Sequence, residues 1–196
     1  SKLMGFKEAP TLFLEFHGSP EGVKEQVDLF EEIARTHGGQ QFHWADTTEE
    51  RSALWEARHK AYFAAQALMP GARALTTDVC VPISKLADAI LAAEQEAEAS
   101  GLPCPIVGHV GDGNFHLLIV FDPDAYTDQE TARKLSAKVV ERALAVGGTC
   151  TGEHGIGSGK KQYLHDEHGN GVAVMAQLKR ALDPNNILNP GKVLDV

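Results

Sequence analysis

The sequence predicts an α+β fold in which helices pack on one side of an antiparallel sheet. Short β-prone runs alternate with segments whose apolar residues recur at helical spacing, and glycine or proline pairs separate these segments. A first strand–helix–strand–helix unit is followed by a second unit of similar order. The predicted order is β-α-β-α-β-α-β-β-α, and a glycine-rich segment and one more helix complete the chain.

The first unit begins with a β-prone run that ends before Ser19-Pro20. Pro20 opens a helix in which Val23, Val27 and Phe30 share one face, and Gly38-Gly39 ends it. The predicted elements of this unit are strands at 11–16 and 41–45, a helix from Pro20 to 37, and a helix capped by Thr47 or Thr48 that ends at Pro70-Gly71.

The second unit continues the alternation until residue 146. Its predicted strands lie at 74–81, 105–110 and 114–121, and its predicted helices at 84–100 and 128–146. The composition changes at 147–161, where six of fifteen residues are glycine. A last helix is predicted at 172–182. We therefore expect a cap domain over 1–146 and a glycine-rich loop with a helical tail over 147–196.

Composition excludes several classes of protein. The formal net charge of the 196 residues is -9 and no block of Lys or Arg is present, which argues against nucleic-acid binding. No apolar run approaches the roughly 20 residues that span a bilayer. Three cysteines without CxxC spacing indicate reduced thiols rather than a disulfide framework. We expect a cytoplasmic location, with peripheral attachment to the inner membrane as the alternative.

Two histidines flank a predicted tight turn. Asp112-Gly113 is a preferred two-residue hairpin turn, and apolar runs lie on both sides of it. This turn would place His109 directly opposite His116, on the same face of the sheet, with Cβ atoms roughly 4.5–5.5 Å apart. Such a pair can bind one metal ion, or it can simply lie on a half-buried sheet face.

The glycine-rich segment offers a third metal ligand. Its glycines would let the backbone approach the site and direct Glu153 and His154 inward. Two histidines and one carboxylate form a common set of ligands for Zn, Mn or Fe, and His154 then remains as a base. The segment fits neither GxxxxGK[ST] nor GxGxxG, so a phosphate-binding loop is not supported. A purely structural loop stays open.

Five motifs together resemble the C-terminal part of FAD-linked oxidases of the vanillyl-alcohol oxidase superfamily. The motifs are WEARH (55–59), TTDVCVP (76–82), GHVGDGNFH (108–116), TGEHGIGSGK (151–160) and NPGK (189–192). The order and spacing are most similar to cytochrome-linked D-lactate dehydrogenases and the FAD subunits of glycolate oxidase. The resemblance extends over nearly the whole chain.

The resemblance implies a division of labour between domains. FAD would lie mainly in an N-terminal domain that this chain lacks, and the present region would form a ferredoxin-like cap with a helical tail. The substrate would bind between the two parts. Asn189 and Lys192 would lie in the tail that approaches the flavin.

The resemblance also implies roles for individual side chains. His109, His116 and Glu153 would bind the divalent metal, His154 would act as the general base, and Arg58 would hold the substrate carboxylate. From the residues alone, Arg58 could equally be a surface arginine beside Glu56.

The resemblance further indicates the substrate class. Relatives that oxidise D-2-hydroxyglutarate tend to carry Lys and Asn where this chain has Thr76 and Leu118. We therefore expect a small monocarboxylic 2-hydroxy acid such as D-lactate or glycolate, which would transfer hydride to FAD; the electron acceptor stays open. The isolated chain should be inactive, and an exposed apolar surface should promote self-association. A metal-dependent hydrolase and a non-catalytic binding module are the alternatives.

Overall fold

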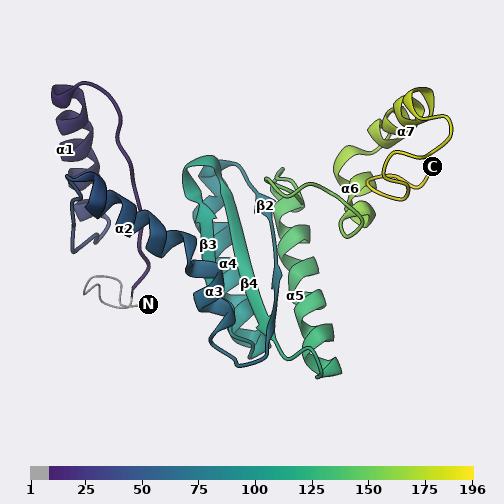
Figure 1. Cartoon of the computed structure of the whole chain (residues 1–196), viewed down its shortest axis with the longest axis horizontal. Helices are drawn as coiled ribbons and strands as arrows, with labels where there is room; N and C mark the ends of the chain where they lie inside the picture. Colours follow the sequence, from purple (N-terminus) through teal and green to yellow (C-terminus); the bar gives the residue numbers. More distant parts are fainter. Residues whose placement is uncertain (1–8) are drawn as a thin grey trace. The chain divides into compact units, whose positions relative to one another are not determined.

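The computed structural model describes residues 9–196 (Figure 1). The chain divides into two compact units. One unit extends to Lys60 and the other from Ala61 to Val196. The functional division expected at 146/147 is a different boundary and stays a prediction.

The first unit contains two helices that begin where the sequence predicts. Helix α1 spans Pro20–Thr36, and the Ser19 side chain accepts a hydrogen bond from the Gly22 amide at 3.2 Å. Helix α2 spans Thr48–His59 and begins with a capping box, in which Thr47 and Glu50 each accept from the other's backbone. Their starts are fixed locally, because none of the described residues of this unit is buried.

Two predicted strands and one predicted long helix are wrong in this part of the chain. Residues 11–16 and 41–45 form no strand, and Gln41 has a positive φ of 58°. A β-prone run becomes a strand only when a neighbour pairs with it, and the described residues of this unit supply no such neighbour. The helix expected to continue to Pro70 ends at His59, and a separate helix α3 follows at Ala61–Gln66.

The second unit is built around one central strand. Strand β4 (Asn114–Phe121) pairs antiparallel with β1 (Arg73–Thr76), β2 (Val79–Cys80) and β3 (Ile106–His109). The strand expected at 74–81 is interrupted at Thr77-Asp78, and both parts pair with β4. The antiparallel α+β arrangement is as predicted.

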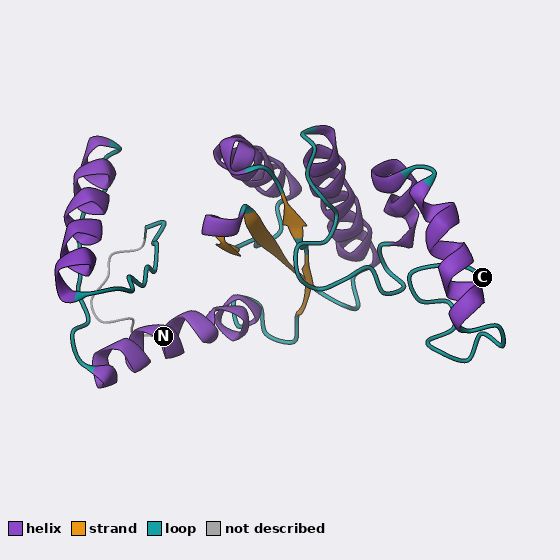
Figure 2. Cartoon of the chain, turned by 90° about the horizontal axis from the view of Figure 1, so that it is seen from above, coloured by secondary structure: helices purple, strands orange, loops and turns teal. Residues whose placement is uncertain are grey.

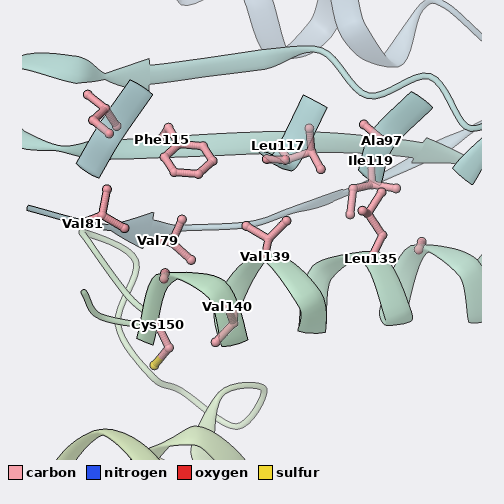
Figure 3. Close-up of a cluster of buried hydrophobic side chains, with 14 residues drawn as sticks. Val79, Val81, Ala97, Phe115, Leu117, Ile119, Leu135, Val139, Val140 and Cys150 are labelled. Carbon is pink, nitrogen blue, oxygen red and sulfur yellow. The ribbon is translucent and has the colours of Figure 1, made fainter. Parts of the chain in front are cut away.

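Two helices cover one face of this sheet. Helices α4 (Ile83–Ser100) and α5 (Tyr126–Ala145) lie side by side on it (Figure 2). Phe115, Leu117 and Ile119 of β4 point into the core that α5 closes with Leu135 and Val139 (Figure 3). Leu117 and Ile119 are 0% exposed, and burying such a side chain stabilises a fold by about 1.5–3 kcal/mol.

The opposite face of β4 is covered at one end. Leu118 and Val120 pack with Ala65 of α3 and with Ala72 in a second buried cluster. Asn114 and His116 continue this face beyond the cluster, because alternate residues of a strand share a face. The candidate site lies at that end.

The chain after α5 forms loops and short helices. Residues 161–163 form the 3-10 turn η2 (Lys161–Tyr163), which is followed by α6 (Leu164–His168) and α7 (Gly171–Leu182). The predicted last helix is confirmed, whereas η2 and α6 were not predicted. The tail folds back, since the Val193 amide donates to the Gly157 carbonyl at 2.7 Å. Among the described residues, no helix is long and apolar enough to cross a membrane.

Candidate metal centre

The hairpin between β3 and β4 has a longer loop than predicted. His109 pairs with Asn114, and Val107 pairs with His116. The intervening residues form the 3-10 turn η1 (Val110–Asp112), and Gly113 closes the loop with a φ of 81°. A Cβ at Gly113 would lie 2.1 Å from the Val81 carbonyl oxygen, so only glycine fits there.

The predicted direct opposition of His109 and His116 is therefore wrong, but their shared face is right. The register differs by two positions, and a shift of two leaves every side chain on the same face. The two imidazole rings lie edge to face with centroids 6.2 Å apart.

His116 is held in one orientation by the backbone. Its Nδ1 lies 2.9 Å from the Thr77 carbonyl oxygen, which can only accept, so Nδ1 carries the proton and donates. Its Nε2 then points at Glu153 Oε1 at 2.9 Å. His116 is only 5% exposed, so water does not surround this pair on the His116 side.

One carboxylate oxygen of Glu153 lies near three imidazole rings. The same oxygen, Oε1, lies 3.6 Å from His109 Nε2 and 3.5 Å from His154 Nε2. The rings of His116 and His154 stack at 5.1 Å between centroids and 6° between planes. The structure thus brings together His109, His116, Glu153 and His154, the four residues that the sequence singles out for the predicted metal site, although they come from two hairpin strands and a distant loop.

A buried carboxylate positions that loop. Asp78 accepts hydrogen bonds from the Thr151 hydroxyl at 2.8 Å, from the His154 amide at 2.9 Å and from Lys160 Nζ at 2.9 Å. The Glu153 amide and the Asn114 side-chain amide also donate to it, each at 3.1 Å. Five donors saturate its two oxygens.

The charge of Asp78 is stabilised despite its burial. Burial alone would raise its pKa, but the hydrogen bonds from Lys160, the His154 amide and the Thr151 hydroxyl outweigh burial and hold the pKa well below its usual range. Sequence reasoning missed Asp78. The signal was an acidic residue inside a β-prone run, where Asp is disfavoured.

The donor set fits a divalent cation. Because His116 Nδ1 carries the ring proton, Nε2 presents a lone pair to the Glu153 carboxylate oxygen at 2.9 Å. Two acceptors approach in this way when a cation or a second proton lies between them. Among the described residues, ligand atoms of Asp78, His116, Glu153 and His154 lie within 4.8 Å of one another. Asp78 is the least suitable ligand of these, because its oxygens already accept five hydrogen bonds.

The other predicted site residues lie elsewhere. Arg58 is on α2 in the first unit, and its role stays a prediction. Asn189 and Lys192 line a shallow pocket of about 380 Å³ between α7 and the tail, and the Lys192 amide donates to the Asn189 carbonyl. Thr76 and Leu118 are direct partners across β1 and β4.

Residues 2–193 match the model of the C-terminal domain of FAD linked oxidases. The chain belongs to this family. It is 50% identical over 194 residues to a Danio rerio protein named probable mitochondrial D-lactate dehydrogenase, covering 98% of this chain and 39% of the relative. It is 44% identical over 188 residues to the mitochondrial cytochrome D-lactate dehydrogenase of Arabidopsis thaliana, covering 95% of this chain and 33% of that protein.

A bacterial relative and a solved structure are also similar. A glycolate oxidase subunit of Bacillus subtilis is 36% identical over 183 residues, which cover 93% of this chain and 38% of that subunit. The 4-ethylphenol oxidase of Gulosibacter chungangensis superposes with a TM-score of 0.58 at 19% identity, over 87% of this chain and 37% of that one, which supports the fold alone. The chain thus spans between 33% and 39% of these curated relatives. The cytoplasmic location stays a prediction.

Proposed function

We propose that this chain is the substrate- and metal-binding part of a flavin-dependent enzyme that oxidises a small D-2-hydroxy acid to the 2-oxo acid. The observation that carries the proposal is the contact of His116 Nε2 with Glu153 Oε1, in a ring whose Nδ1 is fixed by a backbone carbonyl. Family membership supports the reaction class, since relatives are named D-lactate dehydrogenase and glycolate oxidase. No contact in the site favours a hydrolase or a binding module instead.

His109, His116 and Glu153 would hold a divalent Zn, Mn or Fe ion. Such an ion, when bound, polarises a hydroxyl and a carboxylate of the substrate. The His109, Glu153 and His154 side chains are 45%, 45% and 52% exposed, so a small molecule can reach this end of the sheet. Asp78 would stay outside the set of ligands and support it.

His154 would accept the proton of the substrate hydroxyl. Its ring stacks on His116, and its Nε2 lies 3.5 Å from Glu153 Oε1, so this nitrogen is next to the proposed metal ligands, where the hydroxyl of a bound substrate would lie. The chain contributes this proton transfer and the orientation of the substrate.

FAD, held by a separate domain, would accept the hydride. Arg58 would bind the substrate carboxylate as a two-pronged donor, and Asn189 and Lys192 would face the flavin.

The residues next to His116 support a monocarboxylic substrate such as D-lactate or glycolate. Leu118 follows His116 on the same face of β4 and is 1% exposed in the cluster with Ala65. Thr76 pairs with it. Neither side chain can form an ion pair with a second carboxylate.

Metal content tests this proposal directly. The chain would be purified without metal-affinity chromatography, incubated with Mn²⁺, Zn²⁺ or Fe²⁺, desalted and analysed by elemental mass spectrometry. We expect about one equivalent of metal, which should be lost in the His109→Ala/His116→Ala variant. Replacement of His165 and His168 by Ala, outside the site, is the matched control. Equal metal in all three proteins would refute the site.

A further inference from the structure

One buried carboxylate, that of Asp78, contacts both ends of the glycine-rich loop. We infer that Asp78 and Lys160 are positioning residues, which hold residues 151–160 against β4 so that the side chains of Glu153 and His154 meet His116. The expected effect on metal affinity rests on the proposed function. The claim that Asp78 and Lys160 hold the loop in place is independent of any metal.

Asp78 is itself fixed by the sheet. It lies between β1 and β2, and its Oδ1 accepts from the Asn114 side chain, whose amide also donates to the Val79 carbonyl at 3.0 Å. Its side chain is 0% exposed. The carboxylate is therefore a rigid acceptor on the strand face that also carries His116.

The start of the loop rests on this carboxylate. The Thr151 hydroxyl and the amides of Glu153 and His154 donate to it, and the Gly152 amide donates to the Asp78 carbonyl at 2.9 Å. The two amides belong to the two residues whose side chains form the candidate site. Because these amides point at Asp78, the orientation of the backbone at 153 and 154 is set by this one carboxylate.

The end of the loop returns to the same carboxylate. Lys160 Nζ lies 2.9 Å from Asp78 Oδ2, and the Lys160 side chain is only 20% exposed. A buried carboxylate without a cationic partner is strongly disfavoured, whereas a short charge-assisted hydrogen bond offsets its burial. Lys160 thus stabilises the negative charge of Asp78, to which the amides of Glu153 and His154 donate.

Local amide exchange separates this role from a general effect on stability. Hydrogen–deuterium exchange of the metal-free chain would be compared between the wild type, Asp78→Asn and Lys160→Met, at the amides of Glu153 and His154. Both variants should exchange about 10- to 100-fold faster at these two amides, because each weakens hydrogen bonds to a charged acceptor. The amides of Val139 and Val140 in α5 should be unchanged.

Two further variants sharpen the test. Lys161→Met removes the adjacent lysine, which pairs with Asp195 instead, and should leave exchange at 153 and 154 as in the wild type. Lys160→Arg keeps a cation and should preserve protection. If Asp78→Asn also accelerates exchange in α5, the variant has unfolded more widely, and Lys160→Met then decides the question.

Mn²⁺ titration measured by calorimetry then tests the consequence. Asp78→Asn and Lys160→Met should each raise the Kd for Mn²⁺ by about 10- to 100-fold, as loss of a residue that supports a metal site typically does. A wild type that binds none of Mn²⁺, Zn²⁺ and Fe²⁺ would refute the proposed metal site but leave the exchange result standing. Unchanged exchange at 153 and 154 in both variants would overturn the inference. Weaker Mn²⁺ binding with unchanged exchange would instead make Asp78 a metal ligand.

Discussion

Replacing Gly152 with alanine should force the glycine-rich loop away from Asn114 and lower the free energy of unfolding by an amount that follows from the structure. A Cβ at this position would lie 2.1 Å from Asn114 Nδ2, 2.9 Å from its Cγ and 3.2 Å from Asp78 Oδ1. Real Cβ atoms do not approach this closely, so either the loop or the Asn114 side chain must move. Asn114 is buried and held by two hydrogen bonds, so it has little freedom to do so.

The cost follows from the bonds that must break. Moving Asn114 sacrifices a hydrogen bond to the charged Asp78, worth about 1.5–3 kcal/mol, and one to the neutral Val79 carbonyl, worth about 0.5–1.5 kcal/mol. Gly152→Ala should therefore lower the free energy of unfolding by about 2–4.5 kcal/mol.

Urea denaturation followed by circular dichroism measures this difference, and Gly159→Ala is the matched control. Gly159 lies in the same loop, has nothing within 4 Å of an added Cβ and has no positive φ. Its substitution should change the stability by less than about 1 kcal/mol. A Gly152→Ala protein as stable as Gly159→Ala would refute the packing of the loop against Asn114.

Three other predictions follow from the charges and the burial of individual groups. The pKa of Asp78 is lower in the folded protein than its ordinary value of 3.8, so the ionised carboxylate stabilises the fold above that pH, and this stabilisation is lost as the pH falls through the folded pKa. The difference in unfolding free energy between the wild type and Asp78→Asn, measured by urea titration, should therefore shrink below pH 4. Burial raises the pKa of the Cys150 thiol to about 12, so iodoacetamide at pH 8 should label Cys150 only after denaturation, as peptide mass spectrometry would show. If the proposed function holds, then in an enzyme that joins this chain to the proposed flavin domain His154→Ala should lower kcat about 100-fold or more with little change in KM, and Arg58→Ala should mainly raise KM. Steady-state kinetics in which His154→Ala keeps full turnover would eliminate the proposed role of His154 as the base.

Local signals predicted most of the second unit. The helical spacing before Gly101, the β-prone apolar run that ends at Phe121 and the proline at 82 are local signals, and α4, β4 and α5 lie where the sequence predicts them. The strands expected at 11–16 and 41–45 failed because strand formation depends on a partner, and β-propensity does not reveal one.

The site was predictable in composition but not in detail. The two-residue turn at Asp112-Gly113 was the wrong loop, since Val110 to Asp112 form a 3-10 turn and only Gly113 has the left-handed backbone. The error did not separate His109 from His116, because a register shift by an even number keeps both on one face. A shift of one residue would have placed them on opposite faces.

The support of the site could not be predicted from neighbouring residues at all. Asp78 and Lys160 are 82 positions apart, and they meet because the 151–160 loop returns to the interruption between β1 and β2. At that interruption the Thr77 carbonyl accepts from His116 Nδ1, and the Asp78 carboxylate accepts from the amides of the loop. The break in the strand therefore serves two purposes, since Thr77 fixes the imidazole of His116 and Asp78 fixes the loop that brings Glu153 to it. A sequence motif can indicate the ligands, whereas their mutual orientation depends on these two consecutive residues in the break between β1 and β2.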